Sequence, residues 1–316
     1  MKQSTRAYFQ EAKRMGRYGL KERLHGYIYA RWPYLYIGIG TGSHPSFKWL
    51  KRMSDPLIRL FRFLTGIRGA RNSNKDNTVS FADTYHGKVL TLEGARQLVT
   101  VNQPIRLENL EKIIPYQRAR DIVMLNPDKL AVMECPCRST RENPCLPLAV
   151  CLVVGEPFVS FIVEHHPDKS RRITPAEAIE ILEQENDRGH VAHAFFKDVM
   201  LDRFYAICNC CSCCCGAMQA QQNGTPMLAS SGFVCEVDEE YCTSCGSCVE
   251  VCQFEALTLS DFAVIDEQKC MGCGVCETHC SVDAITLRRE PSRGEPLEIE
   301  KLMATYQARV RKSTED

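Results

Sequence analysis

The feature that most constrains this chain is an internal repeat that carries two identical cysteine motifs. Residues 237–259 (VDEEYCTSCGSCVEVCQFEALTL) align without a gap with residues 265–287 (IDEQKCMGCGVCETHCSVDAITL). Each copy contains the spacing C-x2-C-x2-C-x3-C, in which a tight loop wraps three thiolates around one face of a cubane iron–sulfur cluster. The repeat therefore predicts two metal clusters, and the need to ligate them dictates how these residues fold.

In proteins with two such clusters, the fourth cysteine of each motif points away from its own loop and ligates the other cluster. The spacing thus predicts a crossed arrangement, with one cluster held by Cys242, Cys245, Cys248 and Cys280, and the other by Cys270, Cys273, Cys276 and Cys252. Gly246, Gly272 and Gly274 are expected to let backbone amides approach inorganic sulfide. A pair of zinc sites is the alternative, but zinc does not call for two consecutive windings with an exchanged fourth ligand.

These motifs resemble those of bacterial-type ferredoxins that contain two [4Fe–4S] clusters. The resemblance covers residues 231–290 and implies a small pseudo-twofold module that transfers single electrons between two neighbouring clusters. Members of that family often have proline after the fourth cysteine, where this chain has Gln253 and Ser281. The departure predicts a different local turn and different amide donors, with ligation retained.

Ten further cysteines lie upstream of the repeat and form two groups in the sequence. The first group lies within residues 135–151 and the second within residues 208–215, and their members are Cys135, Cys137, Cys145 and Cys151, and Cys208, Cys210, Cys211, Cys213, Cys214 and Cys215. The first group alone offers enough thiolates for one cubane cluster or one closed zinc site. Neighbouring side chains diverge in an extended chain, so the second group predicts two metal centres or one large cluster. Cys235 stands apart and is predicted to be a small buried hydrophobe in a strand.

The stretches CPCR and CNCCSCCC resemble elements of uncharacterised ferredoxin-fused proteins of anaerobic microbes. Cys214-Cys215-Gly216 is also similar to the CCG element of the cysteine-rich domain of heterodisulfide reductases, whose long spacings and final C-x2-C are absent here. An additional iron–sulfur site is the favoured interpretation beside a ferredoxin module. A soft-metal site for zinc or copper and a redox-active thiol relay are the alternatives.

Sequence patterns predict mixed α and β structure between residues 81 and 230. Strands are expected at 130–134, 158–164 and 203–207, and a helix that begins with a capping box is expected within 174–189. Each strand leads directly into candidate ligands. If the strands share a sheet, one edge of that sheet would bring these ligands together. Arg138 is expected to offset the charge of a cluster or to bind substrate. His190 and His193 are close enough to share a metal if they are helical, although such histidines more often cap strands or hydrogen-bond to the backbone. The further candidates near this site are Glu134, His165 and His166.

The N-terminal part of the chain is strongly basic. Residues 1–75 hold 16 basic and 3 acidic side chains, although the net charge of the whole chain is zero. An amphipathic helix is predicted within residues 47–68, either packed onto the fold or, through residues 47–71, in contact with an acidic partner protein or a membrane surface. No motif for reading nucleic acid accompanies the charge, so no nucleic acid partner is expected.

The sequence thus predicts an α+β protein with a ferredoxin-like module after a mixed α/β cysteine-rich domain. The expected parts are a basic, mainly helical segment with a linker (1–80), the cysteine-rich domain (81–230), the dicluster ferredoxin domain (231–290) and a charged tail (291–316). No apolar run is long enough to span a bilayer and the opening residues lack the apolar stretch of a signal peptide, so a cytoplasmic protein is expected, with peripheral contact at the inner face of the membrane as a variant.

The predicted function is to relay single electrons between a partner oxidoreductase and the upstream metal site. Two alternatives remain at this point. In one, the upstream cluster is catalytic and reduces a small molecule or a disulfide. In the other, the upstream cysteines form a zinc or copper binding or sensing module.

Overall fold

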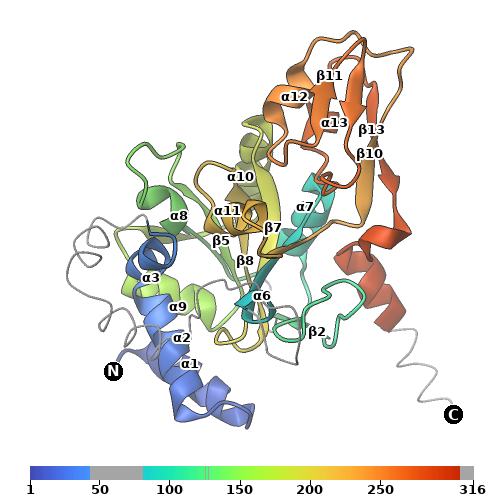
Figure 1. Cartoon of the computed structure of the whole chain (residues 1–316). Coiled ribbons are helices and arrows are strands. Elements are labelled where there is room, and N and C mark those ends of the chain that lie inside the picture. The colour runs from blue at the N-terminus through green and yellow to red at the C-terminus, as the bar shows by residue number, and fades with distance from the viewer. Residues whose placement is uncertain (43–80, 125, 127, 307–316) are drawn as a thin grey trace, which may run out of the picture.

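A seven-stranded sheet lies at the centre of the computed structural model, which describes residues 1–42, 81–124, 126 and 128–306 (Figure 1). The strand order is β6-β4-β5-β8-β7-β1-β9, and all neighbours are antiparallel except β1 and β9. The strands are β1 (Tyr85–Val89), β4 (Leu130–Glu134), β5 (Ala149–Val154), β6 (Ser170–Ile173), β7 (Val191–Lys197), β8 (Arg203–Cys210) and β9 (Leu228–Ala229).

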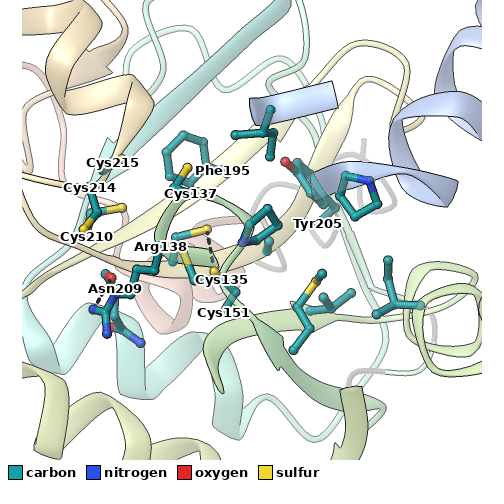
Figure 2. Close-up of a pocket in the computed structure, with 18 of the residues that line it drawn as sticks. Cys135, Cys137, Arg138, Cys151, Phe195, Tyr205, Asn209, Cys210, Cys214 and Cys215 are labelled. Atoms are coloured by element: carbon teal, nitrogen blue, oxygen red, sulfur yellow. Dashed lines mark hydrogen bonds between the residues drawn. The ribbon is translucent and has the colours of Figure 1, made fainter. Parts of the chain in front are cut away.

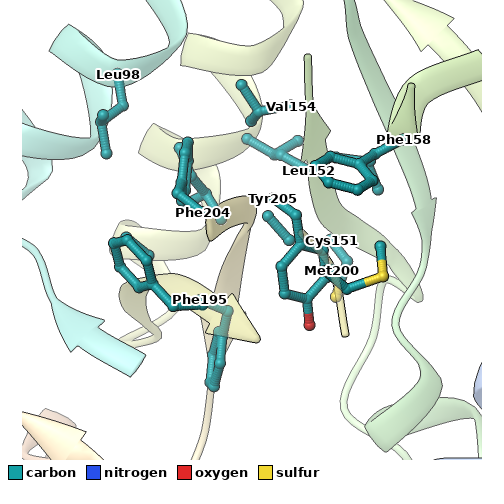
Figure 3. Packing of buried hydrophobic residues seen from close by; sticks show 14 of the residues in the cluster. Leu98, Cys151, Leu152, Val154, Phe158, Phe195, Met200, Phe204 and Tyr205 are labelled. Carbon is teal, nitrogen blue, oxygen red and sulfur yellow. The ribbon is translucent and has the colours of Figure 1, made fainter. Parts of the chain in front are cut away.

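Alternating side chains build a core on both faces of this sheet. Phe204 and Tyr205 are neighbours on β8 and point to opposite sides, Phe204 toward Leu98 and Tyr205 toward Phe158 and Met200 (Figure 3). Helices α7 and α10 pack against each other over one face, and α2, α3 and α9 lie over the other. The helices of this part are α1 (Gln3–Arg14), α2 (Leu20–Arg31), α3 (Pro33–Gly40), α6 (Phe81–Thr84), α7 (Leu92–Thr100), α8 (Pro136–Ser139), α9 (Phe158–His165), α10 (Pro175–Asp187) and α11 (Gly216–Gln222).

The start of α10 confirms the predicted capping box. The Thr174 hydroxyl accepts a hydrogen bond from the Glu177 amide (3.2 Å), and the Glu177 carboxylate accepts one from the Thr174 amide (3.0 Å). These bonds satisfy two amide groups that a helix end otherwise leaves without partners. The predicted strands at 130–134 and 203–207 are also confirmed, as β4 and as the first part of β8.

The predicted strand at 158–164 is wrong, because these residues form helix α9. A short apolar run fits a buried strand and a buried helix equally well. Here Phe158, Val159, Phe161 and Ile162 lie on one helical face and are buried. The Glu156 carboxylate accepts hydrogen bonds from the Ser160 amide (3.2 Å) and hydroxyl (2.7 Å) in the first turn of the helix.

The strand directions gather the upstream cysteines at one edge of the sheet. Strands β4 and β8 are both antiparallel to β5, so their carboxyl ends meet at the edge where β5 and β7 begin. β4 leads there into α8, and β8 leads into the cysteine stretch that precedes α11. The expectation that one sheet edge collects the ligands thus holds for the cysteines that follow β4 and β8.

The cysteine repeat forms a small α+β unit beside the central sheet (Figure 1). Its elements are the paired strands β10 (Phe233–Val237) and β13 (Ile285–Arg289), the hairpin β11 (Leu257–Leu259) and β12 (Ala263–Ile265), and the short helices α12 (Ser247–Val251) and α13 (Val275–Thr278). A further hairpin, β2 (Ile105–Leu107) and β3 (Ile122–Met124), lies outside the main sheet. After the 3-10 turn Pro291–Arg293, residues 299–306 are helical.

The amphipathic helix predicted within residues 47–68 lies outside the described residues. Among the helices that the structure describes, none combines the length and apolarity that a bilayer span requires.

Candidate metal centres

The repeat brings together both cysteine sets that the crossed arrangement predicts. One cavity is lined by Cys242, Cys245, Cys248 and Cys280, which we call the outer set. The other four are called the inner set, in which Cys273 lies close enough to interact electrostatically with the other three: Cys276, Cys252 and Cys270. The inner set lies toward the central sheet, because Cys273 and its neighbours Met271 and Val275 pack against the main core. Cys245 of the outer set is exposed.

Gly272 lets the inner loop pass against strand β10. Its backbone has φ +65°, and a Cβ added there would lie 2.1 Å from the carbonyl oxygen of Phe233. The Ser231 hydroxyl donates to the carbonyl of Gly272 at 2.6 Å and fixes this approach. Gly246 and Gly274 precede α12 and α13 in the left-handed conformation, which glycine adopts without steric cost.

Cys235 lies beside the inner set, although it belongs to neither of the two cysteine motifs. It lies on β10 and is buried, as predicted, and its Sγ is 3.1 Å from Sγ of Cys276. It also contacts Cys270, and this thiol contact lowers the pKa of Cys270. The prediction of a small hydrophobe therefore missed a contact: Cys235 is placed to donate an S–H hydrogen bond to a ligand thiolate. Neither the spacing nor the strand pattern carries that information.

Four upstream cysteines form a tight group that we call the quartet: Cys145, Cys211, Cys213 and Cys214. Their sulfur atoms all lie within 4.8 Å of one another. Cys213 Sγ is 3.2 Å from Cys145, 3.3 Å from Cys211 and 3.7 Å from Cys214. The arrangement suits a single tetrahedral ion, because metal–sulfur bonds of about 2.3 Å place the sulfurs about 3.8 Å apart.

The other six upstream cysteines form a second group, which we call the sulfur arc. Their sulfur contacts run in the order Cys208, Cys151, Cys135, Cys137, Cys215 and Cys210, with Cys151 and Cys208 3.8 Å apart. The arc lines a largely apolar cavity together with Tyr29, Phe195 and Tyr205, and Figure 2 shows Tyr205 across from the sulfurs. Cys211 and Cys214 of the quartet reach the same cavity. The spatial groups therefore differ from the two sequence groups (135–151 and 208–215), because Cys145 of the first sequence group lies with three members of the second.

Arg138 lies between the quartet and the sulfur arc. Its side chain is 1% exposed and pairs with the equally buried Glu185 at 2.5 Å. It also donates to the carbonyl oxygens of Pro147 and Asn209 (2.7 and 3.0 Å), and it is close enough to Cys135 and Cys211 to interact with their charges. The guanidinium Nε has no hydrogen-bond partner among the described residues. This placement fits the prediction that Arg138 offsets the negative charge of a cluster.

The histidines do not form the metal site that the sequence suggested. His190 precedes β7 and contacts Glu185 (2.7 Å), whereas His193 lies within β7 with Nδ1 3.0 Å from the carbonyl of Val191. The two cannot share a metal as a helical pair, because Gly189 ends the preceding helix and the chain enters the sheet. His165 and His166 lie at the end of α9, where they contact Thr5 (2.8 Å) and the carbonyl of Ala30 (3.0 Å).

Glu134 is also a structural residue rather than a ligand. It ends β4, and its carboxylate pairs with Lys169 at 2.7 Å. The carbonyl of Glu134 accepts a hydrogen bond from the Tyr34 hydroxyl at 3.1 Å, which ties α3 to the sheet edge.

The thiols of Cys145 and Cys135 hold their protons unless a metal replaces them. Burial and the contact with Cys213 raise the pKa of Cys145 to about 11. The contact with Cys137, opposed by Cys151 and reinforced by burial, raises the pKa of Cys135 to about 12. Since metals bind the thiolate form, occupancy of these sites must release protons and depend on pH.

Direct hydrogen bonds connect the repeat to the upstream cysteines. The Gln253 side-chain oxygen accepts bonds from the amide (2.9 Å) and hydroxyl (3.0 Å) of Ser212. Nearby, the Asn186 side chain at the end of α10 donates to the Thr278 hydroxyl at 2.7 Å. Gln253 follows a ligand of the inner set, and Ser212 lies between two members of the quartet.

Comparison with known proteins identifies the repeat. A family model described as a 4Fe-4S dicluster domain matches residues 241–285. No curated protein matches the chain. The chain therefore contains a ferredoxin-type iron–sulfur domain that binds at least one [4Fe–4S] cluster, and this domain together with the many cysteines supports a role in iron–sulfur electron transfer.

Proposed function

We propose that the chain relays single electrons between a partner oxidoreductase and an additional metal site built from the upstream cysteines. The observation that supports this most directly is the pair of hydrogen bonds from Ser212 to Gln253. Through the side-chain oxygen of Gln253, the segment that follows Cys252 contacts the segment that carries Cys211 and Cys213. Gln253, one of the two residues at which the chain departs from the ferredoxin pattern, thus connects the two cysteine regions.

The outer and inner sets are assigned as the ligands of two [4Fe–4S] clusters. The shared cavity of the outer set and the proximity of Cys252 to Cys270 and Cys273 support the exchange of the fourth ligand. When bound, such clusters supply reversible one-electron oxidation and reduction. Met271 and Val275, which flank Cys273, pack into the main core and hold the inner set beside the central sheet.

The proposed partner approaches the outer set. Cys245 is exposed there, and the neighbouring Tyr241 is 66% exposed, which offers an aromatic contact for a docking protein. The inner set is covered by the central sheet and its connections. Contact of residues 47–71 with an acidic partner or with a membrane remains a separate proposal.

The relay is tested by following its two steps in the full chain. We would reduce the anaerobically purified protein with a small one-electron donor and record EPR spectra of freeze-quenched samples. The dicluster signals are expected first and a change at the upstream site second. Gln253→Leu should slow only the second step, because it removes the acceptor for Ser212. Ser281→Leu, at the equivalent position of the repeat, is the matched control and should slow neither step. An upstream site that never changes oxidation state would contradict the relay.

Two other functions have an observation in their favour. The apolar cavity beside the sulfur arc, where the Tyr29 and Tyr205 hydroxyls are 2.6 Å apart, favours an iron–sulfur enzyme that acts on a small molecule. The short sulfur separations of the quartet favour a zinc or copper module. In the freeze-quench experiment, oxidation of the upstream site by an added small molecule identifies the first. A redox-silent upstream site that contains zinc or copper and neither iron nor sulfide identifies the second.

A further inference from the structure

We infer that the upstream region contains two separate metal sites: the quartet for a single ion, and the sulfur arc for an iron–sulfur cluster of at least four irons. The inference deepens the proposed function, on which it rests, because it names the site that exchanges electrons with the dicluster domain. The arc has six members: Cys135, Cys137, Cys151, Cys208, Cys210 and Cys215.

The backbone positions the arc on one face of the sheet. Cys151 on β5 stands opposite Cys208 on β8, and Cys210 follows on the same face of β8. Cys135 directly follows the neighbouring strand β4 as the residue before α8, and Cys137 lies within that short helix. Cys215 caps α11 and closes the arc. Three adjacent strands and two helix starts thus present sulfur to one cavity, with α2 and α3 contributing Ala30 and Ile37 to its cover.

The spacing of the sulfurs distinguishes the arc from the quartet. In the described part of the chain, the quartet is the one group of three or more metal-binding side chains whose ligand atoms all lie within 4.8 Å of one another. No three sulfurs of the arc come that close, although each contacts the next. The outer and inner sets of the dicluster domain likewise contain no such compact group. The arc differs from them in that its adjacent sulfurs are in contact, with Cys151 and Cys208 3.8 Å apart. Its six sulfurs nevertheless exceed the four ligands of one tetrahedral ion, which favours a larger metal group.

The donor chemistry and charge of the arc agree with a cluster. The arc consists of thiols alone, without carboxylate or imidazole, and soft ligands of this kind select iron–sulfur clusters, zinc and Cu(I). Arg138 supplies a buried positive charge beside Cys135, and its Nε has no partner in the described structure. Glu185 already pairs with its charge, but a buried donor without a partner is costly, and an anionic cluster would accept the hydrogen bond of this Nε.

The arc also has its own contact route to the inner set. His193 stands opposite Cys208 in the sheet register and is fully buried. Its ring lies 6.5 Å from that of Phe254, measured between centroids, and Phe254 is two residues from Cys252. This route supplements the bonds from Ser212 to Gln253, because Ser212 lies on the segment that also carries Cys210 and Cys215 of the arc.

Counting acid-labile sulfide tests the inference, because a single ion brings none. We would measure iron, sulfide and zinc per chain on the anaerobically purified full-length protein. The wild type should contain about twelve sulfides, eight from the dicluster domain and four from the arc. The Cys151→Ala/Cys208→Ala variant should lose about four irons and four sulfides and keep the metal of the quartet. The matched variant Cys145→Ala/Cys213→Ala should lose one metal ion and keep all its sulfide.

Two outcomes would overturn the inference. One is a wild-type content of about eight sulfides, and the other is a loss of sulfide in the quartet variant but not in the arc variant. If the arc variant also loses the EPR signals of the dicluster domain, Cys137→Ala, in a short helix outside the sheet, repeats the comparison. The result is independent of electron flow: about twelve sulfides with an upstream site that the dicluster domain never reduces would refute the relay and leave the inference standing.

Discussion

At the scale of single residues, Cys235 shows how one side chain adjusts a site without ligating it. Its Sγ lies 3.1 Å from that of Cys276, within the range of an S–H···S contact. Hydrogen bonds to ligand sulfurs stabilise the extra negative charge of a reduced cluster and so raise its reduction potential.

We therefore expect Cys235→Ala to lower the potential of the inner cluster with no change in iron content. The loss of one hydrogen bond of about 1 kcal/mol corresponds to a shift of about 40 mV for a one-electron couple. Redox titration monitored by EPR measures this shift. Cys235→Ser restores a donor and should recover part of it. Loss of iron in Cys235→Ala would show instead that Cys235 is a ligand.

Single residues also mark the limit of what the sequence could predict. The repeat spacing predicts both cysteine sets of the dicluster domain, because local winding determines which sulfurs face one cluster. The upstream groups depend on tertiary contacts, since Cys145 meets Cys211 and Cys213 across sequence separations of 66 and 68 residues. No local pattern separates Cys210 from Cys211, although one belongs to the sulfur arc and the other to the quartet.

At the scale of elements, the two loops of the repeat differ in how closely another backbone approaches them. Gly272 and Ser244 occupy equivalent positions, and both have positive φ, +65° and +54°. Ser244 shows that a side chain is accommodated in this conformation. Gly272 is needed for a different reason, since strand β10 passes so close that a Cβ would lie 2.1 Å from the Phe233 carbonyl oxygen.

We expect Gly272→Ala to separate the inner loop from β10 and to reduce the iron and sulfide content by up to one cluster, about four of each. Ser244→Ala is the matched control and should retain the full content. Metal analysis and EPR of the reduced proteins distinguish the two. Full occupancy in Gly272→Ala would mean that β10 moves aside without consequence for ligation.

The same scale explains why some element predictions held and others failed. Helix α10 carries its own start signal in Thr174 and Glu177, so it is recognisable without tertiary information. The run 158–164 has no such signal in the sequence, and its apolar residues fit a strand as well as a helix. The spacing of His190 and His193 is compatible with a helix, but the chain turns at Gly189 after α10 and His193 lies in the central sheet.

At the scale of the whole molecule, the chain returns to the central sheet after the dicluster domain. The carbonyl of Glu295 accepts a hydrogen bond from the buried Lys88 Nζ on β1 at 2.8 Å, and the Glu295 amide donates to the carbonyl of Lys112 at 3.0 Å. Leu297 and Ile299 then enter the core. The domain is thus held to the sheet at both of its ends.

The buried Lys88 gives this attachment a pH dependence. Burial, with repulsion from Arg289, lowers the pKa of Lys88 to about 7. Between that pKa and the ordinary value near 10.5 the unfolded chain binds more protons than the native one, so stability rises with pH, by at most about 1.4 kcal/mol per unit.

Lys88→Met should therefore be more stable than the wild type below pH 7, and this advantage should shrink as the pH rises toward 10. Thermal unfolding of both proteins under anaerobic conditions, compared at each pH, measures the difference and cancels the titration of the cysteines. A difference that stays constant with pH would show that Lys88 remains charged in the native state.

The dicluster domain is attached at both ends, with its inner set against the sheet and Cys245 exposed. This arrangement also determines how the protein should respond to air. A soluble oxidant such as dioxygen meets the two exposed thiols first, Cys245 of the outer set and Cys213 of the quartet, while the sulfur arc lies beneath α2 and α3. Oxidative damage should therefore begin at these two sites and reach the arc last. A chain that relays electrons as proposed would then lose its contact with a partner before it loses the metal of the arc.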